Sequence, residues 1–122
     1  MTKKLIVWGR EFYLEVIYDV YEGEQLLDIQ KEALVAFEAA SGDILKSYKE
    51  LEEYCIKRDA DLIEAPIKNI FKYVMPQALY VKRNEKKRVV SLLCNYRFDE
   101  EHGIALTFEN EKLKVIGTQD DI

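Results

Sequence analysis

The chain has 122 residues, of which 48% are hydrophobic and 34% are charged, and its formal net charge is -5. This length suits one domain of about 100–200 residues, and the apolar content excludes a disordered chain. The acidic balance argues against nucleic-acid binding, which needs a basic footprint. Residues 1–60 carry 13 acidic and 8 basic side chains, so a basic protein partner is compatible with the charge.

The two cysteines, Cys55 and Cys94, are too few for a disulfide framework and show no zinc-site spacing. We interpret both as buried thiols of a reducing compartment, and we expect no cofactor and no metal. Leu5–Trp8 is too short for the apolar part of a signal peptide, and no apolar run approaches the roughly 20 residues of a membrane span. We therefore expect a cytoplasmic protein without a membrane partner.

Two strands are predicted at the N-terminus, Lys4–Trp8 and Glu11–Tyr18, around Gly9-Arg10. A glycine at the first central position favours a type II′ hairpin turn. Apolar residues alternate along the second strand, which indicates that one of its faces is buried. Trp8 is interpreted as a lid on the core, with an exposed contact residue as the alternative.

Two helices are predicted next, Gln25–Ala40 and Asp43–Arg58, each with an apolar stripe at helical spacing. Gly42 can end the first helix, and Ser41 or Asp43 can cap the second. Because the connection is so short, we expect the helices to pack as an antiparallel pair on the sheet.

A short helical segment is expected between Pro66 and Pro76, because its apolar residues fall at helical spacing. Four strands are then predicted at Ala78–Arg83, Arg88–Tyr96, Ile104–Phe108 and Lys112–Ile116. In the second of these, the run Val89–Cys94 lacks alternation, which is typical of a central strand covered on both faces.

These elements predict a single α+β domain. An N-terminal hairpin and a C-terminal antiparallel four-strand meander form one mostly antiparallel sheet, and the helix pair covers one of its faces.

One short stretch, between the strands that end at Tyr96 and begin at Ile104, has the ingredients of a chemical site. It holds Arg97, Asp99, Glu101, the only histidine, His102, and Gly103. A carboxylate can orient an imidazole and raise its pKa, so catalysis is conceivable. However, neighbours on a turn rarely aim at one substrate atom, and no second histidine is present to complete a metal site.

We therefore favour a structural turn at this stretch. In that interpretation Asp99 binds backbone amides, Gly103 supplies a special dihedral angle and His102 bonds locally. A partner-binding loop is the next alternative and catalysis the last, so the catalytic residues are unknown.

The only basic cluster, Lys82–Arg88, is interpreted as a solvated hairpin loop that discourages pairing between sheet edges, with phosphate contact as the alternative. The eight tyrosines are a high count, and tyrosine is favoured at protein interfaces.

The segment Asn95–Ala105, with its pattern Asp-x-Glu-His-Gly, resembles a family of small bacterial proteins of unknown function. Trp8–Phe12 and Tyr73–Pro76 are similar to the same family, so the resemblance covers most of the chain. Some proteins with comparable signatures look like immunity proteins of bacterial toxin systems. The resemblance implies a bacterial cytosolic α+β protein with a recurring turn, and it names no catalytic residue.

The leading hypothesis is a non-enzymatic protein-binding module, in the manner of an immunity protein that covers a basic toxin surface. The alternative is a ligand-binding protein or enzyme with its site at Arg97, Asp99, Glu101 and His102. A homodimer formed through a sheet edge is a third, weaker option.

Overall fold

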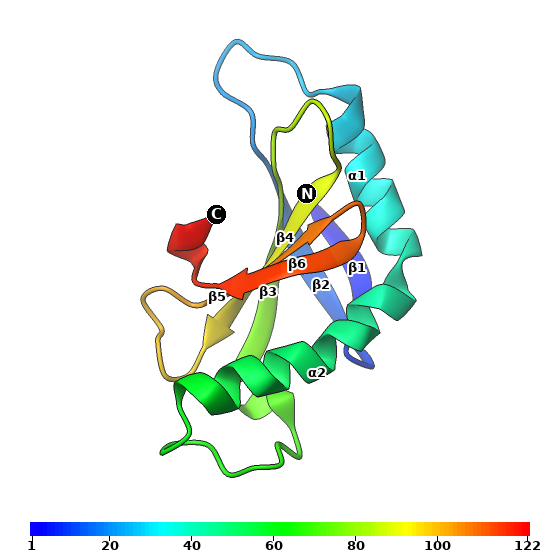
Figure 1. Ribbon diagram of the computed structural model, residues 1–122. Helices are drawn as coiled ribbons and strands as arrows, with labels where there is room; N and C mark the ends of the chain where they lie inside the picture. The colour runs from blue at the N-terminus through cyan, green and yellow to red at the C-terminus, as the bar shows by residue number, and fades with distance from the viewer.

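The computed structural model describes the backbone of residues 1–122 and all side chains except those of Ser41, Asp43 and Leu45. The six strands are β1 (Thr2–Val7), β2 (Arg10–Tyr18), β3 (Val74–Val81), β4 (Val89–Tyr96), β5 (Ile104–Glu109) and β6 (Lys112–Gly117). Along the chain, the helices α1 (Asp28–Ala39) and α2 (Ser41–Arg58) follow β2 and precede β3 (Figure 1). Two short 3-10 turns, η1 (Ile70–Lys72) and η2 (Gln119–Asp121), precede β3 and follow β6.

The strands form one sheet in the order β1-β2-β3-β4-β5-β6. All neighbouring pairs are antiparallel except β2 and β3, which are parallel because both helices lie in the connection between them. The α+β class, the N-terminal hairpin, the C-terminal four-strand meander and the mostly antiparallel sheet are thus confirmed. β4 pairs on both sides and is an inner strand, as predicted.

The first hairpin turns at different residues than the sequence suggested. Val7 pairs with Arg10, so the two turn residues are Trp8 and Gly9, and both have positive φ, 49° and 84°. Positive φ at both positions defines a type I′ turn, not the predicted type II′ turn. The Trp8 side chain is 7% exposed and donates its indole N–H to Ser47 Oγ on α2 at 3.1 Å. Trp8 is therefore a lid on the core, as predicted.

The segment before β3 is irregular, with bends and the single 3-10 turn η1, and β3 already begins at Val74. The helical segment predicted between Pro66 and Pro76 is therefore wrong except for η1. β3 begins at Val74 and contains Pro76, which has no N–H to donate. Pro76 is tolerated because β2 pairs with β3 only from Ala78 onward, and a bulge separates Pro76 from Ala78. At Pro76, β3 therefore pairs only with β4 and has no partner on its other side.

The two helices do not form the predicted antiparallel pair. They meet at one residue, Ala40, and follow an angled path around the sheet (Figure 1). An antiparallel helix hairpin needs a loop of about 2–5 residues, so a single residue cannot reverse the chain. The predicted capping by Ser41 or Asp43 lies outside the described residues.

Each helix covers a different part of the same sheet face. α1 contacts β3 and β4, whereas α2 contacts both edge strands, β1 and β6. α2 therefore reaches from one edge of the sheet to the other.

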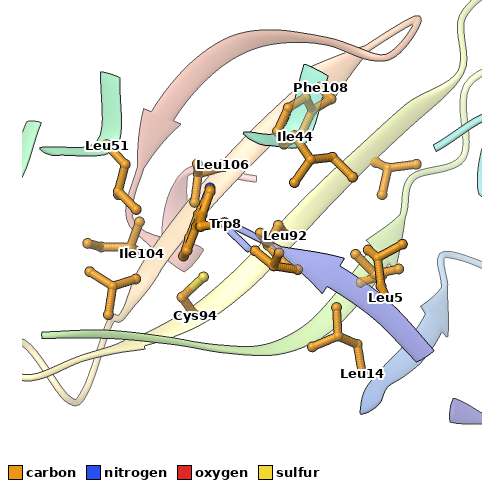
Figure 2. Close-up of a cluster of buried hydrophobic side chains, with 14 of the residues drawn as sticks. Leu5, Trp8, Leu14, Ile44, Leu51, Leu92, Cys94, Ile104, Leu106 and Phe108 are labelled. Atoms are coloured by element: carbon orange, nitrogen blue, oxygen red, sulfur yellow. The ribbon is translucent and has the colours of Figure 1, made fainter. Parts of the chain in front are cut away.

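The core lies between this sheet face and the helices. Figure 2 shows Trp8 among Cys94, Ile104 and Leu106 in this layer. Cys55 and Cys94 are fully buried free thiols, as predicted. Burial raises the pKa of both, that of Cys55 to about 11, so neither thiol is reactive near neutral pH.

Neither helix covers the opposite face, which we call the open face. Its central positions carry small residues, Ala78, Ser91 and Ala105, which are buried between larger neighbours. Ser91 and Thr107 hydroxyls are hydrogen-bonded there at 2.7 Å. The prediction that the strand at Val89–Cys94 is covered on both faces is therefore only half right: these residues are buried, but side chains of adjacent strands shield the open face.

Candidate functional site

The turn between β4 and β5 is closed by hydrogen bonds to Asp99. The Asp99 N–H donates to the Tyr96 carbonyl at 3.2 Å, and the Gly103 N–H donates to the Asp99 carbonyl at 2.8 Å. The carboxylate atom Asp99 Oδ1 accepts the backbone N–H of His102 at 3.2 Å. A short acidic side chain that accepts nearby amides stabilises a turn, and Asp99 does so here.

Gly103 has no room for a side chain. Its φ is +60°, and a Cβ at this position would lie 2.5 Å from the Cys94 carbonyl oxygen and 2.6 Å from Gln119 Nε2. Gln119 Nε2 itself donates to that same carbonyl at 3.1 Å. The glycine therefore allows the turn and the C-terminal segment to approach β4 closely.

A row of alternating charges runs from α2 through the turn to η2. Arg58 Nη2 lies 2.6 Å from Asp99 Oδ2, and Asp99 Oδ1 lies 2.9 Å from His102 Nδ1. The other ring nitrogen, His102 Nε2, lies 3.4 Å from Asp120 Oδ2. We call these four residues the charge row; it connects three segments that are far apart in the sequence.

The charge row favours the charged forms of Asp99 and His102. The hydrogen bond from Arg58, together with that from His102, lowers the pKa of Asp99. The hydrogen bond to Asp99 and the negative charges of Asp99, Asp120 and Glu101 raise the pKa of His102. Because both imidazole nitrogens face carboxylates, neither is directed to a substrate as a general base must be.

The same end of α2 is fastened to the sheet by Tyr96. Tyr96 is fully buried, and its hydroxyl donates to Asp59 Oδ2 at 2.5 Å. The Arg58 guanidinium lies 5.3 Å from the centre of the Tyr96 ring, within cation–π distance. Burial is the main cause that raises the pKa of Tyr96, so it stays a neutral donor.

The structure brings Asp99, His102 and Gly103 together but leaves the other two candidates apart. Glu101 is exposed and acts on His102 only through its charge. Arg97 is exposed as well; its backbone N–H donates to the Tyr73 carbonyl at 2.8 Å, and its side chain lines a surface hollow near η1.

Sequence reasoning missed the partners of the turn, namely Arg58, Asp59, Tyr96 and Asp120. Arg58 is 41 residues from Asp99 along the chain. Nothing in a helix-terminal Arg-Asp pair or in an acidic tail indicates such a contact, so no sequence signal could have identified these residues.

Within the part of the chain that the structure describes, no three His, Cys, Asp or Glu side chains gather as a metal site. None of the described helices has the length and apolar character needed to cross a membrane.

Comparison with known proteins adds a family but no activity. No curated protein and no solved structure matches this chain. One family model matches residues 2–122, nearly the whole chain, and its description is "Domain of unknown function (DUF6985)". The chain therefore belongs to the DUF6985 family.

Proposed function

We propose that this protein is a non-enzymatic protein-binding module whose partner is a basic protein. We further propose that it acts like an immunity protein, by covering a basic surface of a toxin. The single observation that carries the proposal is the open face, a six-stranded sheet surface with exposed apolar side chains and no covering helix. Exposed apolar patches of this kind mark interaction sites.

The strand register defines what the open face presents. One row of paired residues crosses the sheet from β2 to β6: Ile17, Tyr80, Ser91, Thr107 and Val115. Ile17 and Val115, at the two ends of this row, are exposed. Tyr13, two residues before the paired segment Glu15–Tyr18, is 70% exposed on the same face.

The charges on the β2 side of this face are acidic. Glu11 and Glu15 alternate with Tyr13 and Ile17 along β2, so all four side chains point to the open face. Glu11 is partly neutralised by Lys4 at 3.7 Å, whereas no described ion pair includes Glu15. Tyrosine and isoleucine between carboxylates suit a partner that brings lysines or arginines around an apolar centre.

The rival hypothesis, an enzyme at His102, receives less support from the geometry. Its imidazole nitrogens are directed to Asp99 and Asp120, and Arg97 belongs to a separate hollow. The contacts of both ring nitrogens within the charge row support an architectural role for His102.

The proposal is tested by co-expressing the tagged chain with the product of the neighbouring gene in its genome, followed by size-exclusion chromatography. We expect a complex that weakens as salt rises, because charge attraction between exposed groups is screened. Glu15→Lys should weaken the complex, while Glu53→Lys, an equal charge change at an exposed position of α2, should not. Absence of a complex at low salt, or equal effects of both variants, would contradict the proposal.

A further inference from the structure

A surface hollow lies between η1 and the end of β4. Its volume is about 440 Å³, and its lining includes Phe71, Lys72, Tyr73, Asn95, Arg97 and Glu100. This volume falls within the roughly 300–1,000 Å³ of small-molecule sites. We call it the Arg97 hollow.

Two cations line this hollow, Lys72 and Arg97. Of the five arginines, Arg58, Arg83 and Arg88 lie in ion-pair contact with carboxylates. In the described part of the chain, no such contact involves Arg97 or Lys72. Because neither charge is neutralised by a carboxylate of the protein, both are available to an anion from solution.

Aromatic rings line the hollow beside these cations. Lys72 Nζ lies 5.7 Å from the centre of the Tyr73 ring, and Phe71 is another lining residue. The Arg10 guanidinium lies 5.3 Å from the centre of the Phe71 ring and 5.5 Å from that of Phe12. Contact with a ring restrains a cation without cancelling its charge, so Lys72 is partly preorganised and Arg10 adds positive potential nearby.

We propose that the Arg97 hollow binds a small aromatic carboxylate. Arg97 and Lys72 hold the carboxylate, since a guanidinium presents paired donors to a planar oxyanion. Phe71 and Tyr73 provide the surface on which the ligand ring packs, and Asn95 offers a further amide donor. The charges of Lys72, Arg97 and Glu100, which all line the hollow, sum to one positive charge. A monoanion therefore matches the hollow better than a dianion.

This inference does not depend on the proposed function. The hollow is lined by the turn, η1 and the end of β4, and it includes none of the exposed β2 residues of the open face. A failure of one proposal therefore leaves the other standing.

The test is a titration of the ¹⁵N-labelled protein with phenylacetate, followed by amide chemical shifts. We expect saturable shifts confined to residues 71–75 and 95–100, with acetate and benzyl alcohol at the same concentrations giving at least about tenfold weaker binding. Phenyl phosphate, a dianion near neutral pH, should bind more weakly than phenylacetate.

Arg97→Gln should abolish the shifts while the rest of the spectrum stays unchanged, because Arg97 is exposed. Lys86→Gln, at an exposed position of the β3–β4 loop, is the matched control and should bind like the wild type. Shifts that do not saturate, that spread over the surface, that acetate reproduces equally or that persist in Arg97→Gln would each overturn the proposal.

Discussion

Gln30 is the buried polar residue whose replacement tests the folding argument most sharply. Its side chain is 1% exposed and makes three hydrogen bonds. Oε1 accepts the Leu27 N–H at 3.0 Å, and Nε2 donates to the carbonyls of Asp19 at 3.1 Å and Val81 at 3.3 Å. Gln30 thus joins the start of α1 to the point where the parallel strands β2 and β3 end.

Gln30→Leu keeps nearly the same volume and removes all three bonds. The Val81 carbonyl retains the Asp19 N–H at 3.0 Å, so the loss falls mainly on the Asp19 carbonyl and the Leu27 N–H. A buried group left without a partner costs about 1–3 kcal/mol, and the Leu27 N–H is only half-buried. We therefore expect the free energy of unfolding to fall by roughly 2–3 kcal/mol.

The assay is urea denaturation, with thermal unfolding as a second measurement. The midpoint should fall while the m-value stays constant, and Tm should fall by roughly 6–12 °C. Gln25→Leu is the matched control, because the same change is made at an exposed side chain, and its effect should stay within about 0.5 kcal/mol. A Gln30→Leu variant as stable as this control would refute the reasoning.

Three further substitutions test other contacts. Gly103→Ala should reduce the free energy of unfolding by roughly 2–4 kcal/mol in urea denaturation, because its φ is +60° and its Cβ would meet the Cys94 carbonyl; a loss below about 1 kcal/mol would contradict this. Trp8→Phe should cost about 1–3 kcal/mol by the same assay, since it removes the bond to Ser47 and part of a buried ring; an unchanged midpoint would show that the lid contributes nothing. His102→Gln tests the charge row by pH. The pKa of His102 is raised above 6.5, so its stabilisation is full below pH 6.5 and is lost as pH rises through the raised value. The Tm difference from wild type should therefore be largest between about pH 4.5 and 6.5 and shrink by about pH 9, whereas a pH-independent difference would argue against the charge row.

Local patterns were enough to predict most of the fold. Alternation along β2 correctly separated the buried Leu14 and Val16 from Tyr13 and Ile17, because strand side chains point to opposite faces in turn. The apolar stripes predicted both helices for the same reason. The prediction failed in the segment before β3 because Ile67, Ile70 and Val74 are buried at helical spacing although the backbone there is irregular, with only the short turn η1.

Contacts between distant segments could not be predicted. The parallel pairing of β2 with β3 depends on how the two helices return the chain, and local periodicity carries no information about that path. In the candidate site, the turn residues Asp99, His102 and Gly103 were identified because their bonds are local. Arg58 and Asp120 were not, because they meet the turn only in the folded protein.

The central claim, that the open face binds a basic protein, is tested most directly by one affinity comparison. The dissociation constant for the neighbouring gene product is measured by calorimetry with wild type, Tyr13→Ala and Tyr21→Ala. Both tyrosines are exposed, at 70% and 73%, but Tyr21 lies in the loop before α1. We expect Tyr13→Ala to weaken binding by at least about tenfold, as for a central aromatic contact, and Tyr21→Ala to change it by less than about twofold. Equal affinity of wild type and Tyr13→Ala would show that the partner does not bind the open face.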